Sequence, residues 1–111
     1  MAKATLIKEG DLHKEYHGIY ERAMSLGKSM ECVDTVADED MLISVFVKYY
    51  YRVKNYVSLS IICRQIKAEV YVHAITAGGG DSLFNINYGS EEDFLDDFKN
   101  IMLEAGYRVV K

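Results

Sequence analysis

The feature that most constrains the fold is a long alternation of apolar and mixed side chains between residues 41 and 63. Such period-two patterning is typical of β-strands with one buried face and one outward face. Apolar side chains occupy the odd positions from Met41 to Tyr51, and again from Val57 to Cys63. We therefore predict a long β-hairpin whose odd-numbered side chains enter the core.

The same pattern predicts the register of the hairpin. Core side chains of paired strands must share one face, and a slip of one residue would turn the apolar set outward. Odd-numbered residues should therefore pair with odd-numbered residues, across a three-residue loop at 53–55 in which Asn55 takes the left-handed conformation. The even-numbered side chains of both strands then lie on the outward face.

Two helices are expected beside this hairpin. The first runs over 12–26, with Asp11 as its N-cap and Gly27 as its C-terminal stop. The second begins after Gly89, with Ser90 as its N-cap and three acidic residues in its first turn. Each helix has an apolar stripe that can pack on a sheet.

The complete pattern predicts a single α+β domain over residues 1–111, with element order β-α-β-β-β-β-β-α. We expect an antiparallel sheet of five to six strands with both helices packed on one face. Besides the hairpin, its strands are predicted over 4–9, 29–36, 68–77 and 83–88.

Composition narrows the function classes. The net charge is −4 and no lysine or arginine run occurs, so nucleic-acid binding is not expected. No apolar run is long enough for a membrane span, and the start of the chain is too short of apolar residues for a signal peptide. Cys32 and Cys63 lie outside any CxxC motif. We expect reduced thiols, no cofactor, no membrane partner and a cytoplasmic location.

One possible metal site is the stripe His13, His17 and Glu21, spaced by four residues on the first helix. Zinc accepts such ligands. However, no HExxH motif is present, no fourth ligand is near in sequence, and the stripe lies on the polar helix face. We therefore predict a solvated helix face and no metal.

The outward face of the sheet supplies the candidate functional residues. The predicted register places four of its polar side chains in one transverse row: Lys48, Ser60, His73 and Asn87. Neighbouring side chains in such a row lie about 5 Å apart. The candidates for a ligand site or an interface are Phe46, Lys48, Tyr50, Ser60, Ile62, Tyr71, His73, Asn85 and Asn87.

The triple glycine Gly78, Gly79 and Gly80 is a candidate loop site. Phosphate-binding glycine loops run into the N-terminus of a helix, whereas this one leads into a predicted strand. A tight hairpin connection that needs positive φ is the favoured interpretation, and ligand cradling is the alternative.

Three stretches carry a family resemblance: Val47–Arg52 with Ser58–Ser60, then Ala74–Gly80, then Asn87–Phe94. Together they resemble a family of small uncharacterised bacterial proteins, a domain of unknown function. Its pattern combines a Lys-Tyr-Tyr strand, a triple-glycine loop and a Gly-x-Glu-Glu-Asp-Phe helix start. Tyr88 stands where the pattern has tryptophan. The resemblance implies a compact cytosolic domain and brings no activity with it.

We predict a homo-oligomeric binding or assembly module, a dimer, that uses the outward sheet face. Aromatic and apolar side chains there would form a larger patch than monomers usually expose. The alternative is a small enzyme, or a binder of an unidentified small ligand, with a polar site on the same face. A contact between Ser60 and His73 would be its minimum, but no acid joins the row, so no catalytic residue is assigned. A carrier of hydrophobic ligands is a third possibility.

Overall fold

The computed structural model describes residues 1–51, 54–78 and 89–110 of the 111-residue chain. Four of the predicted site residues lie outside these ranges, as does the predicted strand over 83–88: Gly79, Gly80, Asn85 and Asn87. The elements are β1 (Ala2–Glu9), α1 (Leu12–Met24), β2 (Glu31–Ala37), β3 (Met41–Tyr50), β4 (Asn55–Ile66), β5 (Glu69–Gly78), α2 (Ser90–Glu104) and β6 (Arg108–Val109).

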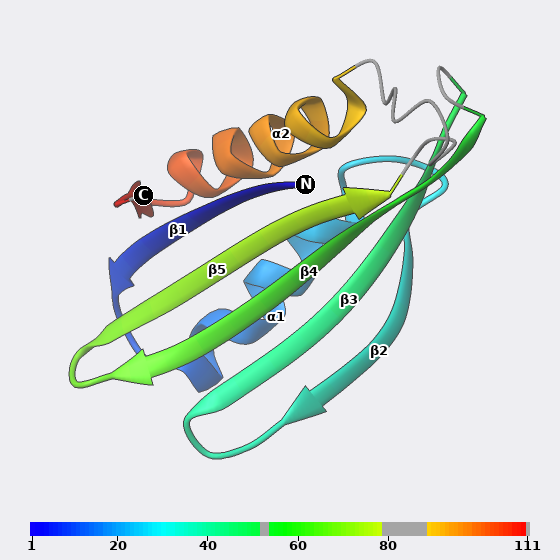
Figure 1. Cartoon of the computed structure of the whole chain (residues 1–111). Coiled ribbons are helices and arrows are strands. Elements are labelled where there is room, and N and C mark those ends of the chain that lie inside the picture. The colour runs from blue at the N-terminus through cyan, green and yellow to red at the C-terminus, as the bar shows by residue number, and fades with distance from the viewer. Residues whose placement is uncertain (52–53, 79–88, 111) are drawn as a thin grey trace.

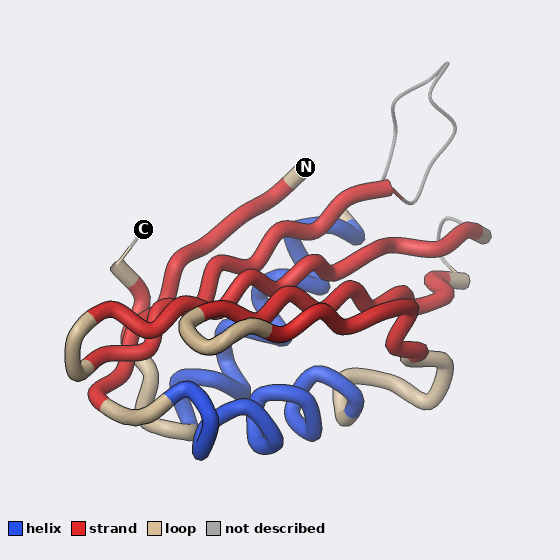
Figure 2. Tube along the Cα trace, turned by 90° about the horizontal axis from the view of Figure 1, so that it is seen from below, coloured by secondary structure: helices blue, strands red, loops and turns tan. Residues whose placement is uncertain are grey.

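All described strands join one antiparallel sheet in the order β2-β3-β4-β5-β1-β6 (Figure 1). Both helices lie against the same side of this sheet (Figure 2). The predicted fold class, an α+β domain with two helices on one sheet face, is confirmed. The sixth described strand is the short β6, which follows α2 and pairs with β1 at Leu6 and Ile7.

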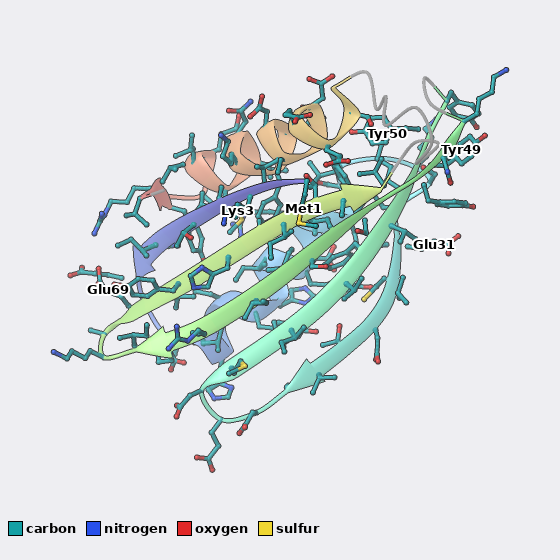
Figure 3. The ribbon with its side chains drawn as sticks, in the orientation of Figure 1. Met1, Lys3, Glu31, Tyr49, Tyr50 and Glu69 are labelled. Carbon is teal, nitrogen blue, oxygen red and sulfur yellow. The ribbon has the colours of Figure 1, made fainter. Side chains whose placement is uncertain are left out.

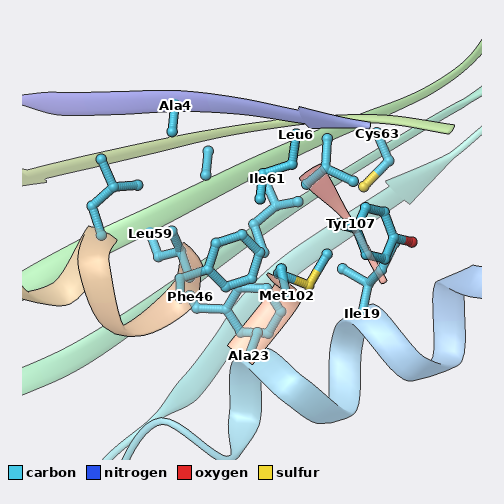
Figure 4. Close-up of a cluster of buried hydrophobic side chains, with 14 of the residues drawn as sticks. Ala4, Leu6, Ile19, Ala23, Phe46, Leu59, Ile61, Cys63, Met102 and Tyr107 are labelled. Carbon is cyan, nitrogen blue, oxygen red and sulfur yellow. The ribbon is translucent and has the colours of Figure 1, made fainter. Parts of the chain in front are cut away.

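The core lies between the helices and the sheet. Phe46 of β3 is 1% exposed, and its ring centroid is 5.8 Å from that of Tyr20 on α1. Figure 4 shows Phe46 and Ile61 of the sheet among side chains of both helices, including Ala23 and Met102. The core is therefore closed on one side by the sheet and on the other by the two helices.

The hairpin register differs from the predicted one. Tyr50 pairs with Asn55, so an even residue of β3 always faces an odd residue of β4, and the connection has four residues. Lys54, with φ of 52°, takes the left-handed conformation expected of Asn55. The prediction that the odd residues of β4 are buried is confirmed, and the corresponding prediction for β3 was wrong.

The physical reason lies in the sequence of β3, which is apolar on both faces. Val45 and Val47 compete with Leu42 and Phe46 for the core. Burying the Phe46 ring removes more apolar area from water than burying either valine. The longer connection permits the register that places Phe46 against the helices.

The predicted N-cap is confirmed for α1 and corrected for α2. Asp11 caps α1, because its carboxylate accepts a hydrogen bond from the His13 amide at 2.9 Å. The N-cap of α2 is Gly89, with φ of 76°, and not the predicted Ser90, which is fully buried. A left-handed residue at that position is most easily supplied by glycine. After α2 the chain turns back, and the Tyr107 amide donates a 3.1 Å hydrogen bond to the Met102 carbonyl.

The polar face of α1 is solvated, as expected: His13, His17 and Glu21 are all exposed. His17 lies 3.7 Å from Glu21. Both cysteines are free, and burial raises the pKa of the Cys63 thiol to about 12. No helix in the described ranges is long and apolar enough to cross a membrane.

The face assignment of β3 can be tested at two adjacent positions. Phe46→Ala should lower the free energy of unfolding by about 3–5 kcal/mol, because it empties a closed core site. Val45→Ala, which alters the other face, should cost under about 1 kcal/mol. Urea denaturation at low protein concentration, where association contributes least, measures both values. Equal losses at the two positions would contradict the assignment.

Tyr107 predicts a pH dependence of stability. Burial and a 2.9 Å hydrogen bond donated to the Glu15 carboxylate raise the pKa of the Tyr107 hydroxyl above its ordinary value. Its contribution should therefore be complete below about pH 10, where unfolded tyrosine begins to ionise, and fall as the pH rises further. Tyr107→Phe should cost about 1–2 kcal/mol at pH 7. The difference from wild type should shrink in alkaline urea melts, and a constant difference would refute this role.

Candidate functional site

The side of the sheet away from the helices forms the open face, which Figure 3 views directly. Strand pairing arranges its centre in three transverse rows across β3, β4 and β5. Each row contains at least one apolar side chain, and none of the nine residues is Asp, Glu, Lys or Arg. The nine positions are Val47, Ser58 and Ala77, then Val45, Ser60 and Ile75, then Ile43, Ile62 and His73.

Charged residues surround this centre. Glu31 and Asp34 lie on the β2 edge, whereas Lys3 lies on β1 near the opposite edge (Figure 3 labels Glu31 and Lys3). Within the described ranges these three side chains form no salt bridge. Glu69 belongs to the same rim but is paired, since its carboxylate lies 3.6 Å from the Arg108 guanidinium. The open face thus has a centre without Asp, Glu, Lys or Arg, inside a rim with charges of both signs.

A hollow of about 480 Å³ lies between β4, β5 and β1 on this face. Two of its lining residues are in contact, because the Thr5 hydroxyl and the His73 Nδ1 are 3.0 Å apart. The imidazole also stacks on Tyr71, with ring centroids 6.5 Å apart and planes inclined by 28°. We call this feature the His73 hollow; its lining residues are Lys3, Ala4, Thr5, Ile62, His73, Ala74 and Ile75.

Four predicted site residues are where the sequence placed them, on the open face. Ser60, Ile62, Tyr71 and His73 all belong to the outward positions of β4 and β5 and are partly buried. The sequence predicted the correct outward face for these residues, because the positions between them in β4 and β5 are clearly apolar. Their role in binding stays a prediction.

Three predicted site residues lie on the other side of the sheet: Phe46, Lys48 and Tyr50. They follow the corrected register of β3, so the predicted row of Lys48, Ser60 and His73 does not exist. Ser60 lies opposite Val45 and Ile75 instead. The direct strand neighbours of His73 are Ile62 and Thr5, not Ser60.

Lys48 has a structural place between the two helices. Its ammonium donates a 2.9 Å hydrogen bond to the Leu26 carbonyl, just beyond the C-terminus of α1. It also lies 4.8 Å from the centroid of the Tyr50 ring and 5.7 Å from that of Phe94. A cation at the end of a helix and over aromatic faces is electrostatically favourable. Lys48 therefore joins the end of α1 to the beginning of α2.

Gln65 organises the opposite end of the sheet. Its side-chain oxygen accepts from the Leu12 amide at 2.7 Å, and its nitrogen donates to the Gly10, Lys67 and Glu69 carbonyls. These bonds tie the β1–α1 loop to the β4–β5 turn. A cleft of about 820 Å³ opens beside them, and Gln65 and Lys67 are among its lining residues.

The glycine loop is described only at its first residue. Gly78 ends β5 with φ of 92°, which confirms that this position needs positive φ. An added Cβ would lie 3.2 Å from the Tyr56 carbonyl oxygen. Gly78 thus permits a close approach between β5 and β4.

Sequence reasoning missed Lys3 and Thr5. They become site residues only because β1 pairs with β5, which is far away in the chain. The alternation along β1 could have identified them, because Lys3 and Thr5 alternate with the buried residues Ala4 and Leu6 and therefore face outward. Ile43 and Val45 were missed as well, since the predicted register placed them in the core.

The fold and the open face define a class: a small α+β domain that leaves one face of its sheet uncovered by the described helices. The chain belongs to a family of unknown function, DUF6054, whose family model matches residues 1–106. This match confirms the resemblance to a domain of unknown function. No curated protein matches the sequence.

The contact between Thr5 and His73 can be tested without altering the fold. Thr5→Val removes the hydroxyl but keeps a β-branched side chain that suits a strand. The change should shift the ¹⁵N resonance of His73 Nδ1, observed in long-range ¹H–¹⁵N spectra. Thr35→Val, which removes a hydroxyl that bonds Ser44 elsewhere in the sheet, should leave that resonance unchanged. An unaltered His73 signal in Thr5→Val would refute the contact.

Proposed function

We propose that this protein is a homodimeric assembly and binding domain in which two copies pack through their open faces. The observation that carries the proposal is the largely apolar centre of that face, without Asp, Glu, Lys or Arg, inside a charged rim. Protein interfaces have this anatomy, with charge depleted at the core and polar residues around it. The two free cysteines support a reducing, cytoplasmic setting for the dimer.

The sequence of β3 supports burial on both sides. A strand with one solvated face normally alternates apolar and polar residues, whereas strands covered on both faces read as continuous apolar runs. From Met41 to Val47 only Ser44 is polar, and Ser44 faces the core, where its hydroxyl lies 3.0 Å from that of Thr35. Ile43, Val45 and Val47 therefore form an apolar ridge on the open face.

The size of the face suits a stable dimer. Five strands from β2 to β1 span about 20 Å, and strands of ten residues extend about 33 Å, giving a projected area of about 650 Å². A standard interface buries about 800 Å² of accessible surface on each partner, and a corrugated sheet exposes more than its projection. Two such sheets would stack about 10 Å apart with a crossing angle near 30°.

A second candidate function uses the His73 hollow as a small-molecule site. Ile62 and Ile75 contribute apolar lining, while Lys3 and His73 contribute polar groups. Such a combination of apolar lining and a few polar groups is typical of ligand pockets. A small anionic molecule with an apolar body fits this chemistry.

The dimer is tested by placing a charge at its centre. Val45→Asp should raise the dimer dissociation constant by roughly 30- to 1,000-fold, or about 2–4 kcal/mol, because the carboxylate would be buried without a partner. Sedimentation equilibrium measures the constant, and circular dichroism checks the fold. Asn100→Asp adds the same charge on an exposed position of α2 and should leave the constant unchanged.

A wild-type chain that stays monomeric at about 100 µM would contradict the dimer, since a standard interface should give micromolar affinity or better. If that monomer also showed saturable changes in the His73 resonances on addition of small anionic compounds, the second candidate would replace the first.

A further inference from the structure

Two sheets that stack face to face in a symmetric dimer are related by a two-fold axis lying between them. An axis parallel to the strands exchanges the two edges of the sheet. Strand β2 of one copy then lies over β1 of the other, β3 lies over β5, and β4 crosses the β4 of the other copy. An axis across the strands instead places every strand over its own copy and exchanges the two ends. The side chains of the open face distinguish these arrangements.

Charge favours the axis along the strands. Asp34, Val45, Ser60, Ile75 and Lys3 form one continuous transverse row. Exchanging the two edges therefore brings the acid at one end of this row over the lysine at the other end, twice in the dimer. The axis across the strands would bring the acidic end of β2 at Glu31 over the acidic turn at 38–40, where like charges repel.

Shape favours the same axis. β4 would cross its own copy at Ser58 and Ser60, two small side chains that permit close approach. The ridge of β3, with Ile43 and Val45, would lie over β5 and the His73 hollow. The axis across the strands would place this ridge on itself. Arg64 also lies on the open face of β4, and the axis along the strands would bring the two Arg64 side chains of the dimer toward each other. Arg64 is two rows from the centre of β4, so a crossing angle near 30° between the sheets separates the two side chains.

We infer, on the basis of the proposed dimer, that its two-fold axis runs along β4, that Asp34 of each copy pairs with Lys3 of the other, and that the β3 ridge fills the His73 hollow. The inference extends the proposed function by naming the contacts that orient the second copy. Neither Lys3 nor Asp34 forms a salt bridge within the described part of one chain, and this arrangement gives each a partner of opposite charge.

Charge reversal provides the test. Lys3→Asp and Asp34→Lys should each raise the dissociation constant of the homodimer about tenfold, because two like-charge contacts replace two attractive ones. Mixing the two variants should restore affinity, since a mixed dimer contains one Asp34–Lys3 pair and one reversed pair. Native mass spectrometry of an equal mixture should therefore show mixed dimers well above the half of all dimers that random pairing would give. Circular dichroism confirms that each variant is folded.

A wild-type dimer whose affinity is unchanged by either single reversal, or variants that mix without preference, would overturn this orientation and leave the dimer standing. The effect of each reversal should also diminish in high salt, which screens rim charges. A monomeric wild type would overturn both the dimer and its orientation, so the two failures are distinguishable.

Discussion

The structure depends on which face of β3 meets the helices. That choice is made by the pairing of β3 with β4, in which Phe46 faces Leu59 and both enter the core. Once this register is set, the ridge of Ile43, Val45 and Val47 must point the other way. The core and the open face are thus two consequences of one pairing, and the apolar character of the open face follows from the burial of Phe46.

The second consequence is functional. Two helices close one side of the sheet, and the described residues provide no third layer for the other side (Figure 2). A ridge with the composition of a core then lies beside the His73 hollow, within a rim that is acidic along β2 and basic at Lys3. A second copy of the chain supplies both an apolar cover and the complementary charges.

The sequence predicted the parts of the fold that local patterns determine. Both helices, the cap at Asp11 and the buried faces of β4 and β5 follow from residues near each other in the chain. Alternation failed for β3 because both of its faces are apolar, so the pattern contained no preference that local reasoning could use. Alternation along β1 could have placed Lys3 and Thr5 on the outward face, but their position beside His73 could not be predicted, since only the pairing of β1 with β5 creates it.

The central claim is that the β3 ridge of one copy contacts the open face of another. Isotope-filtered NOE spectroscopy on an equal mixture of labelled and unlabelled chains measures such contacts directly. The account predicts intermolecular NOEs between the methyl groups of Val45 and Ile75, which lie on strands that would be stacked. A dimer in which the intermolecular NOEs arise only from methyl groups on α1 and α2 would contradict it.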